Sequence, residues 1–221
     1  MLLRIRVRLP DRPGSLGRVA RILGAAGADV VQMTVLERDG GRALDDFTVA
    51  WPAGASIDRL VDGLGSISGV DVEGVWPTVE PQGAFPDAAL LGQLAAEAAD
   101  GLAVFTDALP GIFSADWAAL LRVTSGEPVL VHAGLGPVSD GALPDVRPVR
   151  PRAFTGTDGT NYALAPIGGM RTGLVILVAR TAAPRFHRTE VFRLAQLVNA
   201  AEAVLGPRLG QVAAAVAIAL G

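Results

Sequence analysis

The first 76 residues hold the feature that most limits the possible fold, a regular order of strand-like and helix-like segments. In "LLRIRVRLP", residues 2–10, apolar residues alternate with arginines, so a strand here places the apolar side chains on one face and Arg4, Arg6 and Arg8 on the other. Two more strands are predicted at residues 29–37 and 43–51, joined as a hairpin through "RDGG". Residues 70–76 predict a fourth strand.

Two helices are predicted between these strands. The first has an apolar face at helical spacing and ends near Gly27; its face is formed by Leu16, Val19, Ala20 and Leu23. The second begins after Ser56 as its cap and ends at Gly65 or Gly69; its stripe is formed by Ile57, Leu60, Val61 and Leu64. The order β-α-β-β-α-β predicts a ferredoxin-like antiparallel sheet with both helices on one face.

A rigid corner joins the first strand to the first helix at "DRPGS", residues 11–15. The N-terminus of a helix has unpaired N–H groups and a partial positive charge, so it attracts anions such as a carboxylate. Pro13 presets the backbone, and Gly14 lets a ligand approach the main chain with no Cβ in the way. The same residues also suit a plain strand-to-helix turn that binds nothing.

The segment "LPDRPGSLGRVARILGAAGADVVQM", residues 9–33, together with the βαββαβ order, resembles an ACT domain over residues 2–76. The family senses small molecules in amino-acid metabolism, and in amino-acid-binding members the effector lies between two ACT modules. The resemblance implies a ligand site with one wall from Asp11, Arg12, Pro13, Gly14, Ser15 and Leu16. The partner chain would supply Asp29, Val30 and Gln32.

This sequence departs from the family at Asp11 and Asp29, where amino-acid-binding members often carry amides. Two carboxylates repel a ligand carboxylate unless a cation or the ligand's own ammonium lies between them. Asp29 also has a simpler role open to it, since an Asp just after a turn can satisfy nearby backbone groups.

A second α+β domain with an antiparallel sheet follows a proline-containing linker at residues 79–87. We expect the first domain to span residues 1–78 and the second 88–209, followed by an apolar tail at 210–221. The second domain's predicted elements are one alanine-rich helix, a hairpin, a long proline- and glycine-rich stretch, a second hairpin and a long amphipathic helix, at residues 87–102, 117–135, 134–159, 161–180 and 186–209.

The segments "YALAPIGGMRTGLVILVAR" and "PRFHRTEVFRLAQLVNAAEAVL" make the second domain resemble a GAF domain, although two hairpins with flanking helices also describe PAS-type sensory folds. The resemblance implies a small-molecule pocket between the sheet and its loops. Attachment of a linear tetrapyrrole would need a cysteine, and the sequence has none. Its ligand is not indicated.

Charge and composition favour a cytoplasmic protein without nucleic-acid, membrane or metal partners. The net charge is −3, and the two histidines, His132 and His187, leave little material for a transition-metal site. The start of the sequence has no signal-peptide pattern, and "VAAAVAIAL" at residues 212–220 is shorter than the roughly 20 residues that a spanning helix needs.

No catalytic motif is recognised, so we expect no catalytic residues and no cofactor. Asp45 and Asp46 are adjacent on a strand and point to opposite faces, so they cannot act as an acid–base pair. No sequence spacing suggests a partner for His132. Three arginines in the long stretch form a candidate anion clamp, although exposed loop arginines are usually just solvated; they are Arg147, Arg150 and Arg152.

The sequence therefore predicts a regulatory protein, not an enzyme, that binds a small molecule, an amino acid by resemblance, and acts as a homodimer through its ACT domain. Two alternatives stay open. One is a dimerisation module or regulatory subunit of a separate metabolic enzyme that senses nothing. The other is an enzyme whose site lies in the second domain.

Overall fold

A computed structural model describes residues 1–78, 85–97, 100–124, 127–134, 143–169, 172–206 and 209. The chain forms two compact units, Met1–Glu80 with Ala182–Pro184, and Pro81–Thr181 with Arg185–Gly221. The apolar tail predicted at 210–221 lies outside the described residues. So do 79–84 of the predicted linker and 135–142 of the proline- and glycine-rich stretch.

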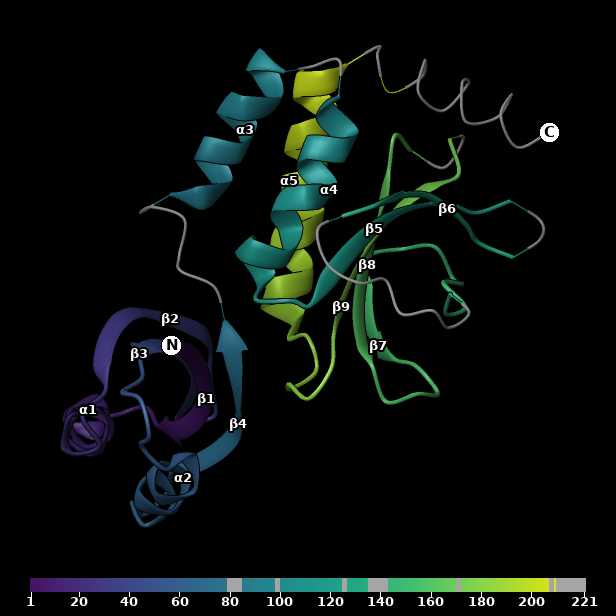
Figure 1. Ribbon diagram of the computed structural model, residues 1–221. Helices are drawn as coiled ribbons and strands as arrows, with labels where there is room; N and C mark the ends of the chain where they lie inside the picture. Colours follow the sequence, from purple (N-terminus) through teal and green to yellow (C-terminus); the bar gives the residue numbers. More distant parts are fainter. Residues whose placement is uncertain are drawn as a thin grey trace. The chain divides into compact units, whose positions relative to one another are not determined.

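The first unit has the predicted ferredoxin-like α+β arrangement (Figure 1). Its four strands form one antiparallel sheet in the order β2-β3-β1-β4. The elements are β1 (Leu2–Pro10), α1 (Ser15–Ala25), β2 (Asp29–Asp39), β3 (Arg42–Ala50), α2 (Ile57–Gly65) and β4 (Asp71–Thr78).

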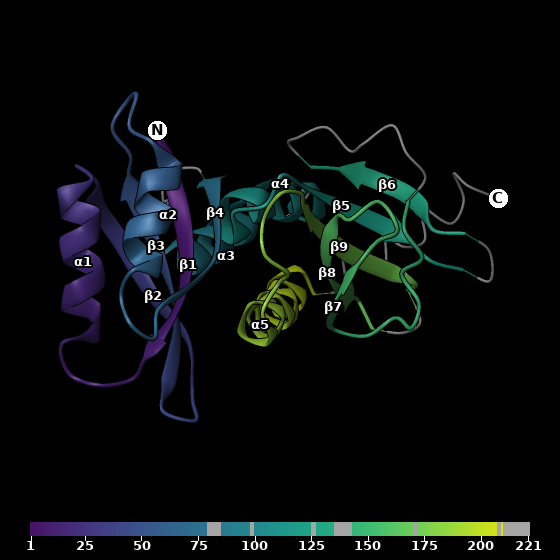
Figure 2. The same ribbon diagram turned by 90° about the horizontal axis from the view of Figure 1, so that it is seen from below.

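The apolar face of this sheet lies under α1 and α2, which are side by side (Figure 2). The register of β1 against β3 explains the core, because Ile5 lies opposite Phe47 and Leu3 opposite Val49. All four side chains are buried with Val19 and Leu23 of α1. Burying each such side chain contributes about 1.5–3 kcal/mol, so this face holds the helices to the sheet.

One detail of the predicted pattern is wrong. Leu16 and Ala20 are exposed in α1, because the helix turns Val19 and Leu23 toward the sheet. Arg6 lies on the predicted opposite face of β1, where it is 1% exposed and its Nε and Nη2 atoms each donate to an Asp46 carboxylate oxygen at 2.7 Å. A buried arginine is tolerated when a carboxylate accepts two hydrogen bonds from its guanidinium group.

Strand β2 forms one edge of the first sheet and is unusually long and exposed for such a position. It has eleven residues and pairs with β3 on one side only within the unit, with register shifts after Val30 and after Val35. Val30, Val31 and Val35 are 39–48% exposed. An exposed edge strand of this kind is a template for pairing with another strand.

The described residues of the second unit form three helices and one five-stranded antiparallel sheet in the order β6-β5-β9-β8-β7. Helices pack on one sheet face, and residues 143–154 supply apolar side chains to the other. The elements are α3 (Pro86–Ala96), α4 (Gly101–Phe113), β5 (Trp117–Arg122), β6 (Val129–Ala133), β7 (Arg152–Thr155), β8 (Asn161–Ile167), β9 (Leu174–Arg180) and α5 (Arg188–Leu205).

The structure corrects two predictions in the second unit. The single alanine-rich helix is replaced by α3, which ends before Glu97, and the separate helix α4. The α4 pattern was hidden by Pro110, which lies inside that helix and has no N–H to donate to the preceding turn. The stretch at 134–159 also contains a short strand, β7, which pairs with β8.

A buried ion pair links the last strand of the second unit to its last helix. Arg180 donates from Nη1 and Nη2 to the two carboxylate oxygens of Glu190, at 3.0 and 3.1 Å. Glu190 also accepts from the backbone N–H of His187, which caps α5. The Arg180 guanidinium lies 3.9 Å from the Phe186 ring centroid.

We expect Glu190→Ala to lower the free energy of unfolding by about 3–5 kcal/mol, because it leaves a buried arginine without its counter-ion. The double variant Arg180→Met, Glu190→Leu should recover most of this loss, since neither charge is then buried. Chemical denaturation, followed through the unfolding transition of the second unit, measures the free energy of unfolding of the single and the double variant. Equal losses in the single and double variants would show that the packing, not the charge, carries the effect.

Candidate functional site

The corner before α1 leaves the start of that helix uncapped and open. Gly14 is the N-cap residue, with φ 84° and ψ −9°, and no side chain caps the helix. A Cβ at Gly14 would have no atom within 4 Å. The backbone holds the turn itself, with Ser15 N–H donating to the Arg12 carbonyl at 3.2 Å. The uncapped N–H groups of the first turn can therefore receive an anion.

Asp11 stands at the entrance of this corner. Its backbone N–H donates to the carbonyl of Gly41 at 2.8 Å, which ties the corner to the β2–β3 hairpin. The Nε atom of Arg38, near the end of β2, lies 3.8 Å from an oxygen of the Asp11 carboxylate. Both side chains are substantially exposed, so they offer one negative and one positive group to solvent.

Asp45 is a buried carboxyl group near the same end of the sheet. It lies opposite Val7 of β1 and Val35 of β2, on the face that carries the helices. The residue is 1% exposed, and within the described chain its Oδ1 atom has no hydrogen-bond partner. A buried polar atom without a partner costs roughly 1–3 kcal/mol, so its retention points to a function.

The environment of Asp45 changes its titration. The pKa of the Asp45 carboxyl is raised to about 6, mainly by burial; Arg38 opposes the rise, and the charges of Asp11 and Asp46 add to it. Asp11 and Arg38 are thus close enough to influence Asp45 electrostatically. The three charged groups and the uncapped start of α1 define what we call the α1 corner.

The neighbouring Asp46 shows what a satisfied buried carboxylate looks like in this sheet. It lies opposite Arg6, and the two side chains form the bidentate pair described above. The prediction that Asp45 and Asp46 point to opposite faces is confirmed. Of the two, Asp46 is paired with an arginine, whereas the Oδ1 atom of Asp45 has no hydrogen-bond donor in the described structure.

One chain brings together only the first wall of the predicted site. Asp11 to Leu16 form the corner, where Arg12, Pro13 and Gly14 are exposed, Leu16 is 39% exposed and Ser15 is buried. Asp29, Val30 and Gln32 lie at the far end of β2, because Asp29 pairs with Ala50 whereas Asp39 pairs with Arg42. The two ends of this strand are about 33 Å apart at 3.3 Å per residue.

Asp45 and Arg38 were missed as site residues in the sequence. The signal that could have revealed Asp45 is its place in the alternation of β3, where Ala43, Phe47 and Val49 share its face and are buried. An acidic residue in an apolar stripe calls for a partner. Arg38 carries no comparable signal, because it looks like an ordinary hairpin residue.

In the second unit, the structure gives His132 a partner that the sequence did not suggest. Its Nε2 atom lies 2.8 Å from Oδ1 of Asp107 in α4. The proposed arginine clamp has a different use, since Arg147 donates to the Thr124 carbonyl at 2.6 Å and Arg152 to the Arg147 carbonyl at 2.7 Å. These two arginines hold the loop, while Arg150 is exposed.

The family model of the ACT domain matches residues 3–50, so this part of the first unit is an ACT domain. No curated protein matches the sequence of the chain.

Three solved structures resemble the chain at 14–18% identity. One is a formyltetrahydrofolate deformylase from Pseudomonas putida KT2440, with 17% identity over 44% of this chain and 39% of that chain and a TM-score of 0.32. Another is a free methionine-R-sulfoxide reductase from Neisseria meningitidis, solved with its substrate, with 18% identity over 58% and 93% and a TM-score of 0.42.

The third is an unknown protein from Galdieria sulphuraria, with 14% identity over 95% of this chain and 93% of that chain and a TM-score of 0.32. At these TM-scores none of the three assigns an activity. The chain spans well under half of the deformylase.

Two further features concern only the residues that the structure describes. No helix among them has both the length and the apolar character needed to cross a membrane. Nor do they bring three or more histidine or acidic side chains together in a group that could hold a metal ion.

We expect Asp45→Asn to raise the free energy of unfolding at pH 7.5 by on the order of 2 kcal/mol. The folded-state pKa of about 6 lies above the ordinary value of 3.8, so the folded state binds this proton more tightly than the unfolded state. Stability from Asp45 is therefore present at low pH and is lost as the pH rises from about 4 through 6. Asparagine has no such loss.

Thermal melts of both proteins between pH 4 and pH 8 measure this difference. The two curves should converge near pH 4, separate between pH 4 and pH 6, and stay a constant distance apart above pH 6. A difference that does not change with pH would show that Asp45 has an ordinary pKa in the folded protein.

Proposed function

We propose that this protein is a regulatory sensor that binds a free amino acid at the α1 corner of a dimeric ACT domain. The proposal is carried by an uncapped helix N-terminus at the same end of the sheet as Asp45, a buried carboxyl group whose Oδ1 atom has no hydrogen-bond partner in the described chain. The ACT domain over residues 3–50 implies a regulatory, small-molecule-binding role. The amino acid is our inference from the charges.

A zwitterion supplies the two charges that the α1 corner lacks. Its carboxylate would accept hydrogen bonds from the N–H groups of the first turn of α1, and its ammonium would donate to Asp45 and Asp11. A ligand with only a carboxylate would face two carboxylates unaided. This resolves the departure from the family at Asp11, because the ligand's own ammonium lies between the acidic groups.

We propose a homodimer that pairs the exposed β2 edges antiparallel. In that arrangement the Asp29 end of one β2 lies beside the Asp39 end of its partner, and therefore beside the partner's corner. This would complete the site with Asp29, Val30 and Gln32. The same exposed edge also supports the alternative of a module that assembles without sensing, because Val30, Val31 and Val35 favour pairing whether or not a ligand is bound.

For the second unit we propose a GAF-like sensory or output domain without catalytic activity of its own. Support comes from the sheet order β6-β5-β9-β8-β7, with helices on one face and residues 143–154 across the other. Effector binding would shift the population of dimer arrangements, and the second unit or a separate enzyme would respond to that change. The location we propose is the cytoplasm.

Gly14→Val is not a clean test of the corner, because φ 84° strains any residue with a side chain there. Leu16 is a better position, since it is exposed in the first turn of α1. We expect Leu16→Asp to weaken binding of the best amino acid about tenfold, about 1.4 kcal/mol, by repelling its carboxylate. The same aspartate suits a helix N-terminus, so the fold should not weaken.

Isothermal titration over the proteinogenic amino acids measures this effect, with Leu16→Asn as the control of equal shape. The asparagine variant should stay within about threefold of the parent. If no amino acid binds the parent below millimolar concentration, the corner is structural and the ACT domain serves assembly.

We expect light scattering to give twice the 22.7 kDa mass of one chain at micromolar concentration. Val35→Lys should raise the dimer dissociation constant at least tenfold. In the pairing that puts Asp29 beside the Asp39 end of the partner strand, residue 35 lies next to the two-fold axis, so the two lysines place like charges close together. The matched control is Val129→Lys, a similarly exposed valine on β6. Equal effects of the two substitutions would contradict pairing through β2.

A further inference from the structure

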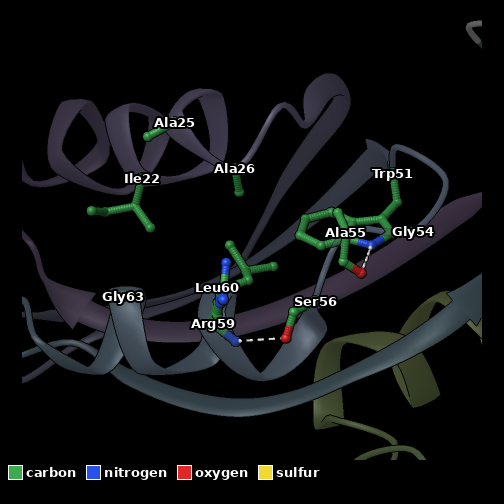
Figure 3. A pocket seen from close by; sticks show the side chains of 10 residues that line it. All are labelled: Ile22, Ala25, Ala26, Trp51, Gly54, Ala55, Ser56, Arg59, Leu60 and Gly63. Atoms are coloured by element: carbon green, nitrogen blue, oxygen red, sulfur yellow. Dashed lines mark hydrogen bonds between the residues drawn. The ribbon is translucent and has the colours of Figure 1, made fainter.

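A second pocket lies in the first unit, at the opposite end of α1 from the corner. Its volume is about 690 Å³, within the range of roughly 300–1,000 Å³ that is usual for small-molecule sites. The last turn of α1, the loop after β3 and the first turns of α2 form its walls. Figure 3 shows Ile22 and Ala26 of α1 across this space from Leu60 and Trp51.

Small residues explain why the space between the two helices stays open here. Ala25 and Ala26 end α1, and Gly54 and Ala55 precede α2. The helices come close together at Gly63, where a Cβ would lie 3.1 Å from Cγ2 of Ile22. The two helices are in contact at Gly63, and the residues next to this contact are small. A gap therefore remains between the helices, which larger side chains would fill.

The polar side chains of the uncharged residues that line the pocket, Trp51 and Ser56, already form hydrogen bonds within the protein. The indole N–H of Trp51 donates to the carbonyl of Ala55 at 3.3 Å, so the ring offers an apolar surface. The Ser56 hydroxyl oxygen accepts from the backbone N–H of Arg59 at 3.3 Å and caps α2. With Ile22 and Leu60, these residues make a wall that favours an apolar group.

Arg59 is the one charged residue among those that line the pocket. Its guanidinium forms no ion pair with any acidic group in the described chain. Asp58 and Asp62 stand on the same helix but do not line the pocket. A space lined by apolar side chains and one arginine without an ion pair, next to the start of a helix, attracts an anion and gives no partner to a cation.

We propose that this pocket binds a small carboxylate that carries an aromatic or branched apolar group and needs no ammonium. The carboxylate pairs with Arg59, and the apolar group packs against Trp51, Ile22 and Leu60. The eleven residues of α1 put the pocket about 16 Å from the corner, so the inference does not depend on the proposed amino-acid site.

The test uses the ¹⁵N-labelled full chain and follows the indole N–H signals of its three tryptophans, with Trp51→Phe to assign the signal of Trp51. The probes are phenylacetate and its neutral analogue phenylacetamide, each up to 10 mM at pH 7.5 and constant ionic strength. We expect phenylacetate to shift the Trp51 signal saturably while Trp117 stays in place. Phenylacetamide should bind at least tenfold more weakly.

Two variants locate the probe. Arg59→Gln should weaken phenylacetate binding at least tenfold, whereas the matched control Arg21→Gln, an exposed α1 arginine outside the lining, should change it less than twofold. Ala25→Phe, at an exposed rim position, should fill the space and weaken binding at least tenfold. Leu16→Asp at the corner should leave phenylacetate binding unchanged.

The proposal is overturned if the Trp51 signal does not move, or if the acid and the amide bind equally. It is also overturned if Arg59→Gln and Arg21→Gln have the same effect, or if Ala25→Phe leaves the affinity intact. Loss of phenylacetate binding in Leu16→Asp would show that phenylacetate binds at the α1 corner and not in this pocket. A failure of amino-acid binding has no bearing on these results, so the two proposals are tested separately.

Discussion

The first unit depends on how helix α1 is held at both of its ends. Gly14 and Gly27 have φ values of 84° and 77°, and each allows the chain to turn sharply into or out of the helix. Between them, Val19 and Leu23 are fully buried against the sheet. The helix is thus a rigid body with one candidate ligand site at each end, since the open start forms the α1 corner and the small residues at its end form the pocket.

Much of this fold could be predicted from the sequence, because periodicity identifies elements that bury one face. The alternation in β1 and the spacing of Val19 and Leu23 gave the βαββαβ order. The missed elements have weak patterns: α4 is interrupted by Pro110, and β7 has only four residues inside a proline-rich stretch. Of the site, the corner was predictable, and the alternation of β3 indicates that Asp45 is buried. Which charged groups lie near Asp45 could not be predicted, because that depends on strand register and on the hairpin around it.

Strand register also decides which buried charges are satisfied. Arg6 meets Asp46 because β1 and β3 pair in a register that puts the two residues opposite each other. One position along, the same register puts Asp45 opposite Val7, which cannot donate a hydrogen bond. The two adjacent aspartates therefore give one internal ion pair, at Asp46, and one buried carboxyl oxygen without a hydrogen-bond donor in the described chain, at Asp45. The second is a cost to stability that an apolar or amide residue would avoid, and such costs gather at functional sites.

The two ends of α1 differ in the ligand that they can accept, because the corner has acidic side chains and the pocket lining has none. At the corner, the positive end of the helix and the carboxyl groups of Asp45 and Asp11 are close together, so a zwitterion satisfies both and a simple anion satisfies only the helix. In the pocket, Arg59 has no acidic counterpart in the lining, so an ammonium there would lose its hydration and gain no partner. If both sites are occupied, they act on the same rigid helix. If one ligand changes the affinity for the other, the second ligand must change the affinity for the first by the same factor.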